Sequence, residues 1–551
     1  MITADFILRG GQVIHVQSRS IECVDVCIKD GKFIEGATDA NEVIELHGSF
    51  VAPGFIDAHM HVESTMLPPT SFATLALPRG TTSAIFDPHE IANVLGITGI
   101  QLILDDAKHI PFDAFFAASS CVPASPLETS GATLLADDLE PLFEDERVIA
   151  LAEMMNYPGV IHDDPEVHKK IKMGLRHGKV DGHCPGVTGQ DLLKYIAAGI
   201  SSDHESTTAK EAQEKLDAGM QIYIREGSAA KNLEALLPIV TPENAHKICF
   251  CTDDRHPADL VREGHIDNIV RKSIALGLDP ILAICIATKH VADHYELSSI
   301  GAIEDGKWAN FIVFDNLQAP NPKQTWHHGN LVAQDGKTIT QFKSDTDWSI
   351  AKNSVHVPPT ITIKSFAINP TSELIRVIGL IPGQLFTEEL HLAITDEDVL
   401  KMAVIERHHN TGNIGLGFVR GFAFKGGAIA STVGHDAHNI AVVGDNDKDM
   451  FIAMQTLQAT GGGQCVVANG NVLAILPLPI AGLMSDAPPS EVIKQQSQVL
   501  KAIASLGCPL DDPFMPLSFL PLSVIPKLKL SDLGLVDVDL FAIVPLEVCP
   551  T

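Results

Sequence analysis

The sequence lacks the features by which membrane proteins are recognised. It contains no uninterrupted apolar run long enough to cross a bilayer. Its first residues, M-I-T-A-D-F-I-L-R-G-G, do not place a basic segment before an apolar one, as a secretory signal would. We therefore expect a soluble, cytoplasmic protein without a membrane partner.

Positive charge is scarce. The chain has 39 Lys and Arg against 69 Asp and Glu, which gives a formal net charge of -30. A strongly negative surface repels polyanions, so nucleic acids and anionic membranes are not expected as partners. Neutral bases would not be repelled.

Cysteine is also sparse, with ten residues in 551. Cys23 and Cys27 are four positions apart and Cys249 and Cys251 two apart, and no C-x-x-C pair occurs. This spacing gives little support to a structural zinc site, and the number does not suit a disulfide scaffold. We expect the cysteines to act as small apolar core residues.

The length and composition predict a globular protein of several domains. A chain of 551 residues is too long for one hydrophobic core and should divide into about three or four domains. Residues 1–52 alternate short β-rich pieces with turn signals, and K-D-G-K at 29–32 is typical of a β-hairpin. We expect a small antiparallel sheet in this part.

Residues 53–295 repeat a pattern of apolar strand, loop and amphipathic helix. Two of the expected helices are D-P-E-V-H-K-K-I-K-M-G-L and T-A-K-E-A-Q-E-K-L-D-A-G. The eight expected strands are F-I-D-A-H-M-H, T-T-S-A-I-F-D, F-D-A-F-F-A-A-S-S, V-I-A-L-A-E-M-M, K-V-D-G-H, G-I-S-S-D-H, M-Q-I-Y-I-R-E and K-I-C-F-C-T-D-D. Eight alternations over this length favour a (β/α)8 TIM barrel over its rival, an open doubly wound sheet.

The first of these strands carries an H-x-H motif. Side chains alternate along a strand, so Asp57, His59 and His61 should point the same way. Neutral imidazole is the commonest protein ligand for a transition metal, and two of them side by side form a bidentate clamp. Taken alone, an H-x-H pair is more often two core histidines satisfied by hydrogen bonds.

Nearly every expected strand ends in polar or ionisable residues, and in a closed barrel these ends meet at one rim. A single one of them could be a helix cap or an ion-pair partner, but seven strands ending this way indicates a site. The rim residues are His59, His61, Asp87, His89, Glu90, Glu153, His183, His204, Glu205, Arg225, Glu226, Asp253 and Asp254.

Two further parts are expected after the barrel. S-I-G-A-I-E-D-G-K-W-A-N-F-I-V-F-D at 299–315 returns to β-rich pieces, as if residues 296–345 completed the N-terminal sheet. Residues 350–551 mix strands such as V-H-V-P-P-T-I-T-I with helices such as D-K-D-M-F-I-A-M-Q-T-L-Q-A, which predicts an α+β domain. Its glycine-rich pieces fit tight turns better than a nucleotide site, because none gives a P-loop or a G-x-G-x-x-G order.

One string of this last part contains metal-ligand residue types. G-H-D-A-H-N-I holds His435, Asp436 and His438. It is either a second metal-binding spot or a loop that closes over the barrel mouth.

The motifs resemble those of the amidohydrolase superfamily of metal-dependent hydrolases. The broad features are P-G-F-I-D-A-H-M-H, a carboxylate on the fourth strand, histidines on the fifth and sixth, and T-D-D on the eighth. More specific strings, among them G-T-T-S-A-I-F-D-P-H-E-I-A-N-V-L-G, D-G-H-C-P-G and G-A-I-A-S-T-V-G-H-D-A-H-N-I, are similar to the bacterial and archaeal adenine deaminase family over nearly the whole chain. The resemblance implies a barrel, a β-sandwich split across it and a C-terminal domain.

The resemblance also implies a binuclear metal centre. His59, His61 and Asp253 would hold one divalent ion, His183 and His204 the second, and Glu153 would bridge them. Many superfamily members bridge with a carbamylated lysine, and V-I-A-L-A-E-M-M-N-Y contains none. Imidazole and carboxylate ligands suit Mn²⁺, Fe²⁺ or Zn²⁺, and the family favours manganese or iron.

The implied reaction is hydrolytic deamination of adenine, in purine salvage. Asp253 would accept the proton of the attacking water, with Asp254 as the competitor for that role. Glu90 or Glu205 would protonate a ring nitrogen. His89, Arg225, Glu226 and Ser228 would bind the purine, unless they serve to hold other residues of the site in place.

Two other functions stay open. A cyclic amidase of the dihydroorotase or hydantoinase type shares the H-x-H and T-D motifs. A non-catalytic binding protein on the same barrel is the second, although such relatives lose metal ligands and this chain keeps every proposed one. The family resemblance also implies a homo-oligomer, a dimer or larger.

Overall fold

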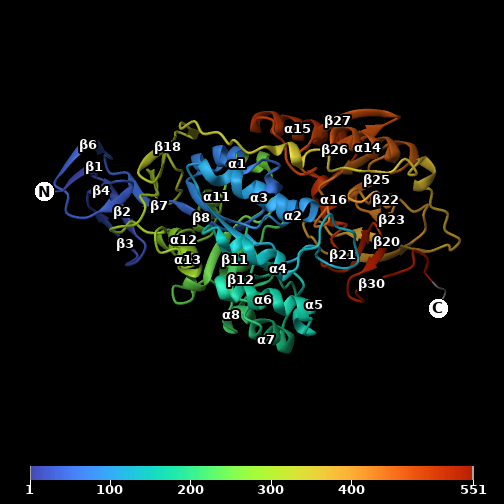
Figure 1. Cartoon of the computed structure of the whole chain (residues 1–551), viewed down its shortest axis with the longest axis horizontal. Helices are drawn as coiled ribbons and strands as arrows, with labels where there is room; N and C mark the ends of the chain where they lie inside the picture. Colours follow the sequence, from blue (N-terminus) through green and yellow to red (C-terminus); the bar gives the residue numbers. More distant parts are fainter. Residues whose placement is uncertain (1, 549–551) are drawn as a thin grey trace.

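Eight parallel strands lie in the middle of the molecule (Figure 1), in a sheet of five and a sheet of three that together form a ring. The computed structural model describes residues 2–548. The eight strands are β8 (Phe55–Met60), β9 (Thr81–Phe86), β10 (Asp113–Ala118), β11 (Val148–Met154), β12 (Lys179–Gly182), β13 (Ser202–Asp203), β14 (Gln221–Arg225) and β15 (Ile248–Cys251). Each lies within a segment that the sequence predicts as a strand, and every residue of β8, β9 and β15 is buried. Apolar strands covered on both faces are typical of parallel sheets.

Two joins close the ring. Between β12 and β13, the Ser201 amide donates to the Val180 carbonyl at 2.9 Å. Between β15 and β8, Met60 and Asp253 form a parallel bridge, and the Asp253 amide donates to the His59 carbonyl at 3.0 Å. The first strand therefore lies beside the last, which confirms the barrel and excludes the open doubly wound sheet.

Helices surround the barrel. They are α1 (Pro69–Ala76), α2 (His89–Leu95), α3 (Ile97–Asp106), α4 (Ala136–Leu139), α5 (Tyr157–Ile161), α6 (Pro165–His177), α7 (Gly189–Ala197), α8 (Ala209–Asp217), α9 (Leu233–Leu236), α10 (Pro257–Arg262), α11 (Ile266–Ala275), α12 (Pro280–Ile286) and α13 (Lys289–His294). The two helices named from the sequence are α6 and α8. The Asp164 carboxylate accepts the Glu166 and Val167 amides at the start of α6, where Pro165 is the first helical residue.

The N-terminal strands form two sheets rather than one. β5 (Lys32–Ile34), β4 (Val26–Lys29), β1 (Thr3–Arg9) and β6 (Asp39–Glu45) form the first. The second joins β3 (Ser20–Cys23), β2 (Gln12–His15) and β7 (Phe50–Pro53) to β16 (Phe311–Phe314), β17 (Gln324–His327), β18 (Asn330–Gln334) and β19 (Lys337–Thr338). Strands from before and after the barrel thus share one sheet, as the sequence predicts for a flanking β-sandwich.

The expectation of a purely antiparallel N-terminal sheet is wrong. β1 pairs with β6 in parallel, and β2 pairs with β7 in parallel. The hairpin at 29–32 is confirmed, because Asp30 and Gly31 both have positive φ and join β4 to β5 in an antiparallel pair. A hairpin is specified by its own turn residues, whereas pairing between distant strands leaves no local signal.

The C-terminal part is an eight-stranded mixed sheet with helices on both faces. Its strands in spatial order are β21 (Thr387–Leu392), β20 (Ile375–Leu380), β23 (Ile414–Arg420), β22 (Val399–Ile405), β25 (Ile440–Gly444), β24 (Gly427–Ser431), β26 (Gly463–Ala468) and β27 (Asn471–Pro477). The helix predicted at D-K-D-M-F-I-A-M-Q-T-L-Q-A is α14 (Asp447–Thr460), whereas V-H-V-P-P-T-I-T-I is not a strand. Pro358 and Pro359 have no amide hydrogen to donate to a sheet, which accounts for this difference.

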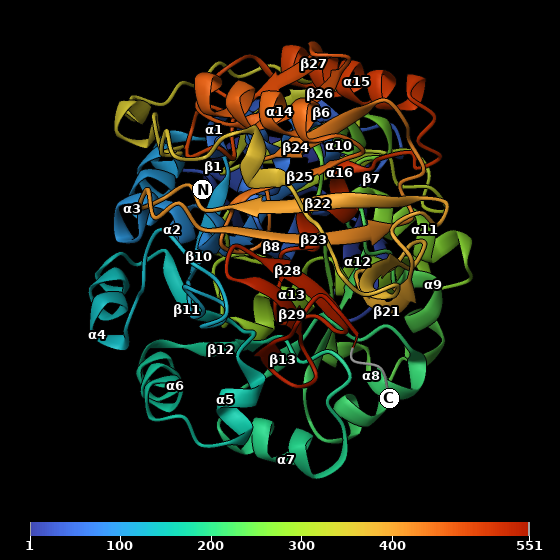
Figure 2. The same cartoon turned by 90° about the vertical axis from the view of Figure 1, so that its right-hand side faces the viewer.

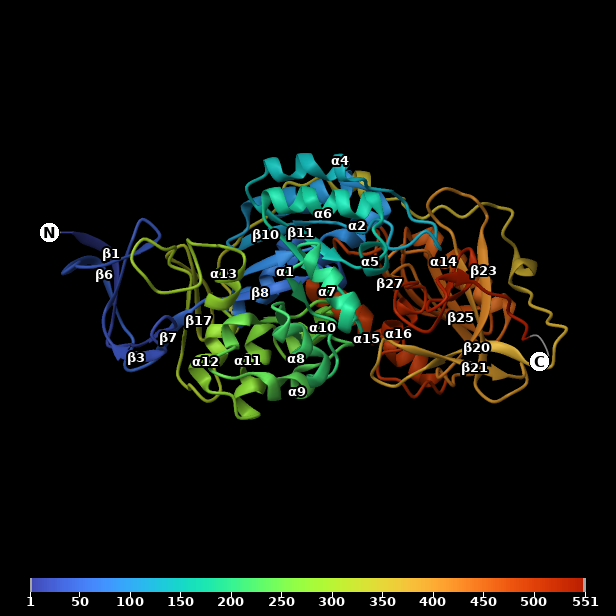
Figure 3. The ribbon, with the colours of Figure 1, turned by 90° about the horizontal axis from the view of Figure 1, so that it is seen from below.

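Alternating side chains divide this sheet between two cores. Ala403 and Ile405 pack with Met450 of α14 on one face. Met402 and Val404 pack on the other with α15 (Pro489–Ser505), in a cluster that also includes Met66 and Leu67 of the barrel. Viewed from the C-terminal side, β22 and β23 cross in front of the barrel (Figure 2), and the three parts lie in a row in Figure 3.

The last elements of the chain belong to the C-terminal part. α16 (Phe514–Phe519) precedes a small sheet of β28 (Leu528–Ser531), β29 (Gly534–Asp537) and β30 (Ala542–Ile543). Among residues 2–548 eight cysteines are buried, as expected of core residues, and Cys23 is exposed. No helix in this range is both long and apolar enough to span a bilayer.

Candidate metal centre

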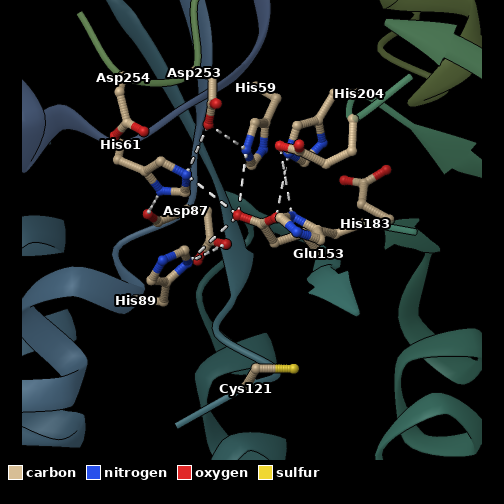
Figure 4. Close-up of polar contacts among 12 residues, drawn as sticks. His59, His61, Asp87, His89, Cys121, Glu153, His183, His204, Asp253 and Asp254 are labelled. Atoms are coloured by element: carbon tan, nitrogen blue, oxygen red, sulfur yellow. Dashed lines mark hydrogen bonds and ion pairs between the residues drawn. The ribbon is translucent and has the colours of Figure 1, made fainter. Parts of the chain in front are cut away.

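Four histidines and two carboxylates meet at the carboxyl ends of the barrel strands (Figure 4). They come from five strands that are far apart in the sequence, and all are buried. The residues are His59, His61, Glu153, His183, His204 and Asp253. These are the six residues that the family resemblance implies as metal ligands.

Glu153 lies at the centre of this group, with one oxygen toward each pair of histidines. Its Oε1 is 3.5 Å from His59 Nε2 and 3.2 Å from His61 Nε2. Its Oε2 is 2.5 Å from His183 Nδ1 and 3.2 Å from His204 Nε2. Burial alone would raise the pKa of Glu153, but His204 and His183 lower it well below its ordinary value. An ionised carboxylate thus stands between two imidazole pairs.

Asp253 completes the half of the site that contains the H-x-H motif. Its Oδ1 is 3.4 Å from His59 Nε2 and 3.1 Å from His61 Nε2. Donor atoms about 2.1 Å from one ion lie roughly 3.0–3.4 Å apart at octahedral or tetrahedral angles. The spacing of these four donors fits a single bound cation.

Unsatisfied nitrogens and the local charge also fit a cation. His59 Nε2 and His183 Nε2 are buried, and neither has a hydrogen-bond partner within residues 2–548. Burial alone would lower the pKa of His59, yet the carboxylates of Asp253 and Glu153, 3.4 and 3.5 Å from its Nε2, raise it to about 10. The carboxylates therefore favour positive charge at this point, which a metal ion would supply in place of a proton.

A second group of contacts fixes the orientation of these ligands. His61 Nδ1 is 2.9 Å from the Asp87 carbonyl, so the proton on Nδ1 leaves Nε2 free to face Glu153 and Asp253. Asp87 Oδ2 is 2.9 Å from His89 Nδ1, and Ser119 Oγ donates to Asp87 Oδ1 at 3.2 Å. The sequence places Asp87 at the rim without assigning it this role.

Asp253 and Asp254 both face the site, although neighbouring strand residues normally alternate. Asp253 has a φ of 56°, in the left-handed region, so the strand bends where it ends. Asp254 Oδ1 accepts a hydrogen bond from Ser64 Oγ at 2.5 Å. Asp253 Oδ2 accepts from Arg225 Nη1 at 2.6 Å, while Asp253 Oδ1 faces the histidines. Asp253 is thus the one of the two that is close to both His59 and His61.

Arg225 is held between two carboxylates of the site. Its guanidinium pairs with both oxygens of Glu205, with Nη2 at 3.0 Å from Oε2, and also contacts Asp253. Glu205 Oε1 is in turn 3.5 Å from His204 Nε2. Arg225 and Glu205 therefore form part of the cavity wall, next to the pair formed by His183 and His204.

Two of the expected purine-binding residues lie outside the cavity. Glu226 pairs with Lys272 and accepts the Leu233 amide at 3.1 Å. Ser228 Oγ donates to Asp259 Oδ2 at 2.5 Å and lines a separate surface groove. The loop after β14 turns both side chains toward α10 and α11, which favours the alternative that they hold other residues in place. His89 and Arg225 do line the cavity.

The C-terminal part supplies the opposite wall of the cavity. The cavity is small, with a volume of about 20 Å³, and the barrel ligands form one side of it. The other side consists of Leu385, His435, Asp436, Phe519, Leu522 and Ile525. The apolar members were not found from the sequence, because nothing in their local pattern separates them from ordinary core residues.

The G-H-D-A-H-N loop joins this wall to the barrel. His435 Nδ1 is 2.6 Å from Glu90 Oε1, and His438 Nε2 pairs with Glu90 Oε2. Burial alone would raise the pKa of Glu90, but His435, His438 and His89 lower it well below its ordinary value. Of the two alternatives for this string, the structure favours the loop over the barrel mouth.

Comparisons with known proteins agree with this architecture. Residues 50–339 match the model of the amidohydrolase family, and residues 385–542 match that of the adenine deaminase C-terminal domain. The crystal structure of an adenine deaminase is 16% identical with a TM-score of 0.45, over 60% of this chain and 100% of that one. The family assignment rests instead on the more similar sequences below.

Three adenine deaminases are similar to this chain along nearly all its length. The protein from Desulfatibacillum aliphaticivorans is 44% identical over 99% of this chain and 97% of its own. That from Methanothrix thermoacetophila is 45% identical over the same shares, and that from Nitratidesulfovibrio vulgaris strain DP4 is 43% identical over 94% and 92%. The chain therefore belongs to the adenine deaminase family of amidohydrolases.

Proposed function

We propose that this protein hydrolyses adenine to hypoxanthine and ammonia, as a step of purine salvage. The observation that carries the proposal is the position of Glu153, whose two oxygens each face a separate pair of histidines. This arrangement suits two divalent ions, which we propose to be Mn²⁺ or Fe²⁺, with Zn²⁺ as the alternative. His59, His61 and Asp253 would hold one ion, His183 and His204 the other.

The reaction requires a nucleophile that water alone does not supply at neutral pH. Divalent ions held by these residues would lower the pKa of a water molecule from 15.7 to about 7 and would so supply the nucleophile that C6 of the purine requires. The task of Asp253 is to accept the proton released during the attack and to pass it toward the departing amine. Arg225, at 2.6 Å from Asp253 Oδ2, keeps this carboxylate oriented.

Addition to C6 places negative charge on the purine ring, so a ring nitrogen must be protonated. Glu205 and Glu90 are both at the cavity wall and are the two candidates for this step. Glu205 is bound on both oxygens by Arg225, whereas Glu90 is bound by His435 and His438. The histidines around Glu90 are themselves proton carriers, so a proton could reach the ring along that side.

The decisive assay compares two substrate classes. Metal-loaded protein is incubated with adenine and, separately, with dihydropyrimidines, and release of ammonia or ring opening is followed. We expect release of ammonia and formation of hypoxanthine from adenine. Turnover of a cyclic amide with no action on adenine would favour the hydantoinase-type alternative, and inactivity on both with metal bound would favour a binding protein.

Removal of metal is expected to abolish activity reversibly. Dialysis against a chelator should leave two imidazole pairs beside Glu153 and Asp253 without their cation, so the thermal midpoint of unfolding should also fall. Activity and the midpoint are measured after return of Mn²⁺, Fe²⁺ or Zn²⁺, with metal content determined for each. Full activity in protein stripped of metal would contradict the proposal, and the metal that restores the highest rate at two equivalents identifies the preferred cofactor.

We also propose that the protein acts in the cytoplasm as a homo-oligomer, a dimer or larger. The support for this is the resemblance to the family. Light scattering of the purified protein measures its mass directly, and a mass of one chain would contradict the oligomer.

A further inference from the structure

Two carboxylate oxygens of the cavity wall have no hydrogen-bond partner among residues 2–548, Asp436 Oδ2 and Glu90 Oε1, and Glu90 Oε1 is ion-paired with His435 at 2.6 Å. Asp436, in the loop between β24 and β25, is 2% exposed and lines the cavity. Its Oδ2 is buried and receives no hydrogen bond from the residues the structure describes. A buried acceptor in this condition is costly unless a ligand completes it.

The other carboxylates that line the same cavity already have partners. Glu205 is bound by Arg225, and Asp253 by the same guanidinium. Glu90 is bound by His435 and His438, and Asp254 by Ser64. Asp436 is therefore the carboxylate with the most hydrogen-bonding capacity left for a molecule in the cavity.

The loop that contains Asp436 is held in place by the C-terminal part. Arg407 is fully buried and donates to the carbonyls of His438 and Ala481, the latter at 2.9 Å. His435 stacks on Phe519 with ring centroids 4.3 Å apart and an interplanar angle of 10°. The loop is thus fixed on both sides of Asp436, so its carboxylate is positioned before any ligand arrives.

The imidazole ring of His89 lies between Asp436 and the proposed metal ligand Glu153. Asp436 Oδ2 is 3.9 Å from His89 Nε2, and the other nitrogen of that ring, Nδ1, is 3.7 Å from Glu153 Oε1. A planar base with its reacting carbon at Glu153 would extend along this wall. Its far edge would then come near Asp436.

The chemistry of adenine indicates which atom Asp436 would meet. Neutral adenine has two kinds of donor: the exocyclic amine, which must lie at the metal centre to be replaced, and one ring N–H on the five-membered ring. A carboxylate oxygen is suited to accept that N–H. A nucleoside has a sugar at N9 and lacks it.

We propose that Asp436 accepts a hydrogen bond from the five-membered-ring N–H of the purine, and thereby selects the free base over N9-substituted purines. The inference rests on the proposed function, and it assigns to Asp436 the discrimination between adenine and N9-substituted purines. Burial, with repulsion from Glu90, raises the pKa of Asp436 to about 7. The substrate N–H supplies the missing donor.

The test compares adenine with 9-methyladenine, in which the ring N–H is absent. Asp436→Ala and Asp436→Asn are assayed beside the wild type for kcat and KM, with 9-methyladenine as substrate or competitive inhibitor. We expect Asp436→Ala to raise KM for adenine about 10- to 100-fold, the usual loss for a hydrogen bond to a charged group. Its affinity for 9-methyladenine should not fall, so the preference for adenine narrows. Asp436→Asn keeps the size and an acceptor oxygen and should lie between.

Three controls separate the possible failures. Asp345→Ala removes an exposed aspartate that does not line the cavity and should behave as the wild type. Metal content and the circular dichroism spectrum are measured for every variant. Wild-type protein that does not act on adenine would overturn the proposed function. If the wild type is active, an unchanged KM for adenine and an unchanged preference for adenine over 9-methyladenine in Asp436→Ala would overturn the inference but not the proposed function. Loss of metal from Asp436→Ala would also overturn the inference, because it would assign Asp436 to the metal centre.

Discussion

Glu153→Gln is expected to lower kcat/KM for adenine by at least about 1,000-fold and to reduce the bound metal to less than one ion per chain. The amide has one neutral oxygen and one nitrogen, so it cannot offer an anionic oxygen to each histidine pair. Without two ions the pKa of water stays far above neutrality, and the nucleophile is lost. Metal analysis and steady-state kinetics on the same sample measure both effects.

The matched control for this variant is Glu144→Gln. Glu144 lies in the same segment of chain, before β11, and its side chain is exposed. The control should keep wild-type metal content and activity. A Glu153→Gln protein with two ions and undiminished turnover would remove the basis of the proposed metal centre.

Asp253→Asn is expected to reduce kcat by about 100- to 10,000-fold, the range for loss of a general acid or base. Asparagine keeps the size of the side chain and can still accept from Arg225, so the fold around β15 should persist. The variant loses the anionic oxygen that faces His59 and His61 and cannot take up a proton. Kinetics across a range of pH, with metal content measured in parallel, separates loss of the base from loss of the ion.

The adjacent residue provides the comparison that assigns the proton acceptor. Asp254 accepts a hydrogen bond from Ser64. Its pKa is raised mainly by burial and also by repulsion from Asp253. We expect Asp254→Asn to reduce kcat much less than Asp253→Asn does. The reverse order, at equal metal content, would transfer the role to Asp254.

The sequence predicts those parts of the site that lie on single strands. An H-x-H motif, a fourth-strand glutamate and T-D-D each belong to a short apolar segment, and parallel barrel strands bring such ends to one rim whatever the loops between them. His59, Glu153 and Asp253 could therefore be named before their distances were known. The hairpin at Asp30 and Gly31 is local in the same sense.

Features that depend on pairing between distant segments could not be predicted in this way. The parallel pairs β1–β6 and β2–β7 have no turn signal, because each joins strands separated by other elements. Leu385, Phe519 and Ile525 become part of the cavity only when the C-terminal sheet lies over the barrel. Glu226 and Ser228 were assigned by proximity to the end of β14, and the turn of that loop removes them from the site.

Closure of the barrel by its first and last strands determines when the reactive centre can exist during synthesis. Thr252 Oγ1 donates to Asp57 Oδ2 at 2.6 Å, across 195 positions of the chain. A nascent polypeptide that has emerged only through the sixth strand has five of the six proposed ligands but no Asp253 beside the H-x-H pair. The wall opposite arrives later still, with His435 and Phe519. A metal ion bound before these residues are synthesised would have an incomplete set of ligands that is open to solvent. We therefore expect tight metal binding only at the end of translation.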